Sequence, residues 1–216
     1  MRRDPQSHVS RMGDLRVLFV MATEQEYGEH LRRVITPLVT GVGPVEAAAA
    51  TGATLGSLAA DNALPDLVFS VGSAGSRTLI HAGLYQIESI TYRDMDATAI
   101  GFAKGVTPFL DEPATIAVRH RLSGIPVASI ATGASIVSGR AYDAVEADMV
   151  DMESFAVYRA ARRFGVPMIG LRGISDGQAE LSGLHDWMEY LHVIDHKLAS
   201  AVDAFASQVA RGEFTL

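Results

Sequence analysis

The stretch that decides the fold is LVFSV at Leu67–Val71, which runs directly into the small-residue turn GSAG at Gly72–Gly75. It is short and apolar with no polar face, as is typical of a strand covered on both sides. Two further runs have the same character, Leu15–Ala22 (LRVLFVMA) and Met168–Ile174 (MIGLRGI). Strands of this kind predict a sheet that lies between two layers of helices.

Segments with helical character separate the apolar runs. We predict helices over Val45–Ala60, which follows Pro44, over Glu153–Phe164, and over a long amphipathic segment, Asp186–Ala210. The other predicted strands are Leu38–Val42, Leu84–Tyr92, Ile125–Ala131 and Asp148–Met152, with a loop-rich stretch at Asp94–Pro113. This alternation predicts an α/β sandwich with a mainly parallel or mixed sheet.

Length and composition narrow the class of protein. The 216 residues fit one domain, and hydrophobic residues at 48% against charged residues at 20% exclude a disordered chain. There are no cysteines, which excludes disulfides, thiolate metal sites and a cysteine nucleophile. The net charge of −7 has the wrong sign for a nucleic-acid-binding module. We therefore expect no nucleic-acid partner.

The N-terminal segment gives the domain boundary and the expected location. Residues 1–14 begin with arginines at positions 2 and 3 and have no apolar stretch behind them, so they do not resemble a secretory signal. We expect a loose tail over 1–14 and a single domain over 15–216. No segment reaches the ~18 apolar residues of a membrane span. The expectation is a soluble, cytoplasmic protein with no membrane partner.

Three carboxylates stand where predicted strands end. Glu26 follows the first strand, Glu153 follows Asp148–Met152, and Asp176 follows the LRGIS strand. Ligands of α/β sheets bind at the carboxyl ends of strands, so these groups are candidates for one site. A carboxylic acid and a carboxylate are what cleavage of a glycosidic bond requires, because one protonates the leaving group and the other activates water. Acidic residues at strand ends are common, so solvated loop carboxylates and helix caps remain the alternative.

Six segments along the chain together resemble the nucleoside phosphorylase/nucleosidase superfamily, and within it the 5′-methylthioadenosine/S-adenosylhomocysteine nucleosidases. They occur in the family's order over almost the whole chain after residue 14. They are ATEQE (22–26), GVGPVEAA (41–48), VGSAGS (71–76), RDMDATAIGF (93–102), VDMES (150–154) and LRGISD (171–176). The resemblance implies a three-layer αβα sandwich around a central mixed sheet, usually a homodimer. It also implies hydrolysis that releases adenine and a 5-thio-substituted ribose, with no cofactor and no metal.

The resemblance also implies roles for the residues that match the family's motifs. Glu26 matches the glutamate that activates the attacking water, and Asp176 matches the aspartate that gives a proton to purine N7. Glu153, preceded by Met152, matches the glutamate that holds the ribose hydroxyls. Ser73 matches a serine beside the anomeric carbon.

Further matches concern the positioning of these groups and the walls of the substrate site. Arg172 matches an arginine that helps to place the water, and Ser175 matches a serine that steadies the aspartate. Ile136 stands where the family often has an aromatic residue on adenine, and Trp187 matches a phenylalanine that covers the 5′-alkylthio group. Val42 and Val137 complete the expected substrate-binding set.

Other functions remain open at this stage. One is a related adenosine-type nucleosidase with another tail, such as an aminofutalosine-like substrate; another is a phosphate-dependent nucleoside phosphorylase. Ser70 stands where the phosphorylase branch has an arginine, and acidic ATEQE would repel phosphate, so water is the favoured nucleophile. A catalytically inactive nucleoside-binding protein is the third alternative.

Some motifs have simpler structural interpretations. Gly41–Gly43 lacks the third glycine of a dinucleotide-binding turn, since Glu46 stands there. His192 and His196 have a spacing that can bind a metal, but they have no evident third ligand, and a solvated helix face is favoured. Arg172 has an alternative as a structural ion pair, with Glu26 as the expected partner.

Overall fold

The computed structural model describes residues 4–180 and 182–216, and the strands in them form one mixed nine-stranded sheet. The strands are β1 (Val9–Met12), β2 (Leu15–Met21), β3 (Leu38–Val39), β4 (Leu67–Gly75), β5 (Leu84–Tyr92), β6 (Thr115–Ala117), β7 (Val127–Thr132), β8 (Met149–Asp151) and β9 (Met168–Asp176). β4 pairs in parallel with both β2 and β9, whereas β5 pairs antiparallel with β9 and β6. The predicted mixed sheet is confirmed.

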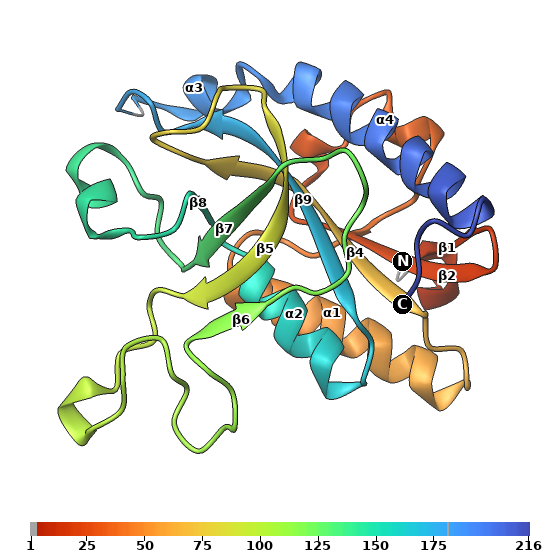
Figure 1. Cartoon of the computed structure of the whole chain (residues 1–216), viewed down its shortest axis with the longest axis horizontal. Helices are drawn as coiled ribbons and strands as arrows, with labels where there is room; N and C mark the ends of the chain where they lie inside the picture. Colours follow the sequence, from red (N-terminus) through yellow and green to blue (C-terminus); the bar gives the residue numbers. More distant parts are fainter. Residues whose placement is uncertain (1–3, 181) are drawn as a thin grey trace.

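Helices cover both faces of this sheet, as Figure 1 shows. The α-helices are α1 (Pro44–Ala60), α2 (Ser154–Arg163), α3 (Leu184–Met188) and α4 (Leu191–Ala210). Short 3-10 turns lie at η1 (Pro5–His8), η2 (Glu24–Glu26), η3 (Leu31–Arg33), η4 (Thr98–Ile100) and η5 (Gly139–Ala144). α4 lies on one face, and α1 and α2 lie on the other (Figure 1). The three-layer αβα sandwich is therefore confirmed.

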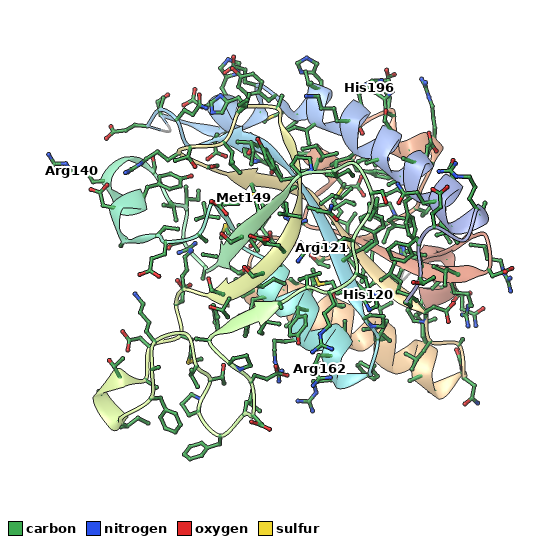
Figure 2. The ribbon with its side chains drawn as sticks, viewed as in Figure 1. His120, Arg121, Arg140, Met149, Arg162 and His196 are labelled. Carbon is green, nitrogen blue, oxygen red and sulfur yellow. The ribbon has the colours of Figure 1, made fainter. Side chains whose placement is uncertain are left out.

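Each layer of helices has its own apolar core against the sheet. Between the sheet and α4, Phe19 stacks on Phe69, and Phe205 meets Phe69 edge-on. On the opposite face, residues such as Leu55 of α1 and Val157 of α2 pack against the sheet. Burial on both faces is the physical reason why the central strands read as continuous apolar runs. Figure 2 shows the outer sides of the same layers, where His196 on α4 and Arg162 on α2 point away from the sheet.

The pairing of strands curls part of the sheet so that several strand ends meet. Starting at β4, hydrogen-bonded neighbours lead through β9, β5, β7 and β8 and return to β4, where Gly75 pairs with Val150. The register of β4 and β9 shifts at Ala74, which sets Gly75 opposite Asp176. This curl brings the ends of β4, β8 and β9 to one place, although they are far apart in the sequence.

Two expectations about the ends of the chain are wrong. The N-terminal segment is not a loose tail where the structure describes it, because β1 pairs antiparallel with β2, with Val9 opposite Leu18. The edge of β2 would otherwise leave its backbone groups without strand partners. Residues 1–3 lie outside the described part. The long C-terminal helix is divided, with α3 ending at Met188 and α4 beginning at Leu191. Tyr190, between them, packs its ring on His81.

None of the helices in residues 4–180 and 182–216 is both long and apolar enough to cross a bilayer.

Candidate active site

A cavity of about 640 Å³ opens where β4, β8 and β9 end. Ten of the eleven predicted site residues line it, although they come from segments spread over most of the chain. These ten are Glu26, Val42, Ser73, Met152, Glu153, Ile136, Val137, Ser175, Asp176 and Trp187. The volume suits a small organic molecule rather than a polymer. The sequence motifs therefore converge on one site.

Glu26 ends the short turn η2 and is almost completely buried, with 7% of its surface exposed. The Ser73 backbone N–H and the Ser73 hydroxyl both donate to its Oε1, at 2.7 Å each. Its other oxygen, Oε2, is buried and has no hydrogen-bond partner among the described residues. Burial raises the pKa of Glu26, and the two Ser73 bonds and the charge of Arg172 oppose that rise. A carboxylate with a raised pKa and a free oxygen is equipped to take a proton.

Glu153 stands at the N-terminal end of α2 and faces the same cavity. Its Oε1 accepts a hydrogen bond of 2.7 Å from the backbone N–H of Gly43. Burial, and then the negative charge of Asp151, raises the pKa of Glu153 to about 7. The glycine-rich turn before α1 therefore fixes this carboxyl from the opposite side of the site.

Asp176 is the last residue of β9, and its carboxyl lies at the cavity wall. The Ser175 hydroxyl donates to Asp176 Oδ2 at 2.7 Å, which is the contact that the resemblance implied. Burial raises the pKa of Asp176, while the Ser175 bond and the nearby His81 act in the opposite direction. A raised pKa favours the protonated form that a general acid needs.

The remaining predicted residues form the apolar walls. Ile136 is 73% exposed and Val42 is 56% exposed, whereas Val137 is buried. Trp187, on α3, donates from its ring Nε1 to the Ser73 hydroxyl at 3.0 Å, which ties this helix to the serine that holds Glu26. The Ser73 side chain therefore links the indole of Trp187 to the Glu26 carboxylate.

Arg172 is the predicted residue that the structure does not place in the cavity. It is 3% exposed, and its guanidinium pairs with Asp151 at 3.0 Å rather than with Glu26. It also donates to Ser70 at 3.0 Å and to Ser154 at 2.8 Å. Because its side chain lies beneath the site, Arg172 acts on Glu26 and Glu153 through its charge, which lowers both pKa values.

Several residues at the cavity were not singled out in the sequence. Asp151 lines it and is held by Thr132, Ser154 and Arg172. Arg93 also lines it and donates to Ser135. Asp151 lies in the motif VDMES, and Arg93 lies in the motif RDMDATAIGF, so both belong to segments that the sequence analysis selected. Nothing in the spacing of these motifs distinguishes the two residues from their neighbours.

The histidine pair on α4 lies away from this cavity. His192 and His196 are both exposed, as predicted, and His196 packs against the ring of His30. Asp195, between them, is buried and accepts from the backbone N–H groups of His30 and Leu31. In the described residues, no three histidine or acidic side chains are grouped closely enough to hold a metal ion.

Comparison with known proteins identifies the family. The model of the phosphorylase superfamily matches residues 18–207, which is most of the chain. A curated 5′-methylthioadenosine/S-adenosylhomocysteine nucleosidase from Geobacillus kaustophilus (strain HTA426) is 32% identical over 166 residues, covering 68% of this chain and 68% of the relative. Glu26, Glu153 and Asp176 all lie within the residues that the superfamily model matches.

Solved structures share the fold. The 5′-methylthioadenosine/S-adenosylhomocysteine nucleosidase of Neisseria meningitidis, in complex with methylthio-immucillin-A, superposes with a TM-score of 0.71 at 23% identity, covering 90% of this chain and 98% of that one. The futalosine hydrolase of Helicobacter pylori strain 26695 gives a TM-score of 0.72 at 18% identity, covering 89% and 97%. Together with the family model and the curated relative, the fold confirms the resemblance: this chain belongs to the phosphorylase superfamily and, within it, to the family of 5′-methylthioadenosine/S-adenosylhomocysteine nucleosidases.

Proposed function

We propose that this chain hydrolyses the N-glycosidic bond of 5′-methylthioadenosine, S-adenosylhomocysteine or both, releasing adenine and a 5-thio-substituted ribose. One observation carries the proposal: Glu26, Glu153 and Asp176 line a single cavity, and burial raises the pKa of each. The name of the curated relative supports the same substrates. The reaction needs an acid, a base and a group that holds the sugar, and the site has a carboxyl for each.

Asp176 is the proposed general acid. Its raised pKa favours the protonated carboxyl, and Ser175 fixes the orientation of that carboxyl. The proton passes to N7 of the purine as the bond between C1′ and N9 breaks. Adenine then leaves as a neutral base, and positive charge develops on the ribose ring. The buried carboxylates nearby stabilise that charge.

Glu26 is the proposed general base. Ser73 holds its Oε1 through two hydrogen bonds, and this leaves Oε2 to accept a proton from water. The water oxygen then forms the new bond to C1′, and the proton remains on Glu26. Glu153 accepts hydrogen bonds from the ribose hydroxyls, which aligns the anomeric carbon with the water.

Water is the proposed nucleophile rather than phosphate. Ser70, where the phosphorylase branch has an arginine, is buried and accepts a hydrogen bond from Arg172. The guanidinium of Arg172 is already paired with Asp151. A phosphate dianion at the Glu26 end would therefore meet a carboxylate, and the Arg172 guanidinium would not be free to bind it.

The test is adenine release from 5′-methylthioadenosine, followed by chromatography with and without phosphate. We expect phosphate-independent release together with the free thio-sugar. Release that requires phosphate and yields a sugar 1-phosphate would contradict the hydrolase. An aminofutalosine-type nucleoside is assayed in parallel. Faster turnover of that compound would mean that the chain is the related nucleosidase for adenosine derivatives with another 5′ substituent.

A homodimer is the proposed assembly. Its support is a group of exposed apolar side chains on the segment between β5 and β6, namely Ile100, Phe109 and Leu110. Sedimentation velocity on the wild-type chain tests it, and a single monomeric species at micromolar concentration would contradict it. The cytoplasmic location and the absence of a cofactor stay predictions from the sequence.

A further inference from the structure

Tyr142, on η5, is buried behind the cavity wall and was not among the predicted site residues. Its ring packs with Ala131, Val137 and Val150, and the last two line the cavity. Tyr142 is 7% exposed, and its hydroxyl has no hydrogen-bond partner among the described residues. Figure 2 shows Arg140 of the same turn pointing outward. A buried hydroxyl that is left unpaired is unfavourable, so its surroundings decide what it does.

Two glycines leave the space in which this hydroxyl lies next to Asp176. A Cβ atom on Gly75 would stand 2.4 Å from the Tyr142 hydroxyl oxygen and 2.7 Å from Asp176 Oδ1. A Cβ atom on Gly177 would stand 2.6 Å from the same hydroxyl oxygen. The hydroxyl and Oδ1 are therefore neighbours across Gly75, and any side chain at that position would separate them.

The charges around the pair favour a neutral tyrosine that donates. Burial, and then the charge of Asp176, raises the pKa of Tyr142 well above its usual value, whereas Arg77 and Arg93 lower it. The Arg77 guanidinium lies over the Tyr142 ring, 5.3 Å from its centre. On the other side, Asp176 faces Ser175 and His81. The phenol keeps its proton at neutral pH and has that proton to donate.

We propose that Tyr142 is a positioning residue for the proton donor, and that its hydroxyl donates a hydrogen bond to Oδ1 of Asp176 when that carboxyl gives up its proton. Ser175 already donates to Oδ2, so the two hydroxyls stabilise the developing carboxylate from both sides. A carboxylate oxygen has two lone pairs, which lets Oδ1 accept this bond and still face the cavity. The catalytic consequence rests on the proposed function, whereas the hydrogen bond itself does not.

The first experiment measures the protonation of Asp176 without using activity. The carboxyl carbon of Asp176 is titrated by ¹³C NMR, and its signal is assigned by its loss in Asp176→Asn. Tyr142→Phe removes the donor to the ionised form, so we expect the midpoint to rise by about one pH unit, a tenfold change in the ionisation equilibrium. Tyr158→Phe, on α2 and outside the cavity lining, is the matched control and should leave the midpoint in place. An unchanged midpoint in Tyr142→Phe overturns the proposal.

A second measurement uses the wild-type chain, in case the variant does not fold. The ring carbon that bears the Tyr142 hydroxyl should shift with the same midpoint as Asp176, and this response should vanish in Asp176→Asn. If the signal of this Tyr142 ring carbon does not change as Asp176 titrates, the proposal is also overturned.

The kinetic readout separates positioning from packing. Tyr142→Phe should lower kcat about tenfold with little change in KM, and it should move the alkaline limb of the pH–rate profile to higher pH. A variant with a lowered kcat but an unmoved limb would point to packing alone and would contradict the proposal. If the wild-type chain releases no adenine, the proposed function fails, and the NMR titration still decides the hydrogen bond.

Discussion

The cavity has two walls that are built differently. The catalytic wall consists of Glu26, Ser73, Glu153, Ser175 and Asp176, which stand at strand ends or in the turns beside them. The loop wall consists of residues 135–138, 182–184 and Trp187. On the catalytic wall, Glu26 is 7% exposed and Ser175 1%; on the loop wall, Ile136 is 73% exposed and Leu184 67%.

This difference assigns separate tasks to the two walls. The carboxyls of the catalytic wall are held by short hydrogen bonds and have pKa values raised by burial, which are requirements of the chemical step. The large apolar side chains of the loop wall are Ile136, Val137, Leu184 and Trp187, and the exposed Ile136 and Leu184 are suited to contact the base and the tail of a nucleoside. Substitutions should therefore affect kcat on the first wall and KM on the second.

The largest expected effect is on the catalytic wall. Asp176→Asn and Glu26→Gln keep the shape of each side chain and remove the ability to give or take a proton. We expect kcat for adenine release to fall about 10²–10⁴-fold in each variant, with KM within a few-fold of wild type. Steady-state kinetics on 5′-methylthioadenosine measures both constants.

Asp203→Asn is the matched control for these variants, because Asp203 is exposed on α4 and far from the cavity lining. It should behave as wild type. If Asp176→Asn keeps its kcat, Asp176 is not the acid; if Glu26→Gln keeps its kcat, Glu26 is not the base.

The second effect concerns stability beneath the catalytic wall. Arg172→Met leaves Asp151 buried without its cation, and breaking a buried pair costs about 3–5 kcal/mol of unfolding free energy. Denaturant unfolding followed by circular dichroism measures this loss. Arg211→Met removes the cation of an exposed pair with Glu213, which solvent screens, and it should change the unfolding free energy far less. If the two variants lose equal amounts of unfolding free energy, the buried pair of Arg172 and Asp151 does not stabilise the catalytic wall.

The catalytic wall also shows what the sequence could and could not predict. The boundaries of β5, Leu84–Tyr92, were predicted as the structure has them, because alternation and the flanking glycine mark them. The carboxylates were found because each follows an apolar run. The pairing of Arg172 with Asp151 instead of Glu26 was missed because β9 is buried on both faces, so alternation along it does not reveal which side chains meet.

Other features had no adequate sequence signal. β1 is a four-residue edge strand, VSRM, whose pairing with β2 depends on the partner rather than on its own composition. The Tyr142 hydroxyl and Asp176 both lie beside Gly75, where β4 pairs with β8, the strand that follows η5. Local periodicity describes elements, but contacts made by the closure of a sheet depend on pairings that the sequence does not display.

The third prediction concerns the free energy of unfolding, which the buried Glu153 carboxyl of the catalytic wall lowers when it ionises. The pKa of Glu153 rises from 4.5 to about 7, so the folded chain holds this proton more tightly than the unfolded chain does. Stability is therefore lost as pH increases from about 4.5 to about 7, and it is not recovered above that range. Glu153→Gln cannot ionise and keeps the oxygen that accepts from Gly43. We expect it to be more stable than wild type at pH 8, by up to about 3 kcal/mol, with no difference at pH 4.

Unfolding curves at the two pH values measure this difference. Glu146→Gln, at an exposed position on the segment after η5, is the control and should track wild type at both. A Glu153→Gln variant that is less stable than wild type at pH 8 would contradict a raised pKa at this position.

The smallest effect is expected on the loop wall. Ile136→Phe adds an aromatic face where many family members have one, and a ring stacked on adenine contributes about 0.5–1.5 kcal/mol beyond its area. KM for 5′-methylthioadenosine should therefore fall about 2- to 10-fold, while kcat stays within twofold of wild type because no carboxyl of the catalytic wall is touched. Ile80→Phe, at 72% exposure and outside the cavity lining, controls for the general effect of an added surface ring. A change in kcat without a change in KM would mean that the two walls do not act separately, and the division of tasks between them would have to be abandoned.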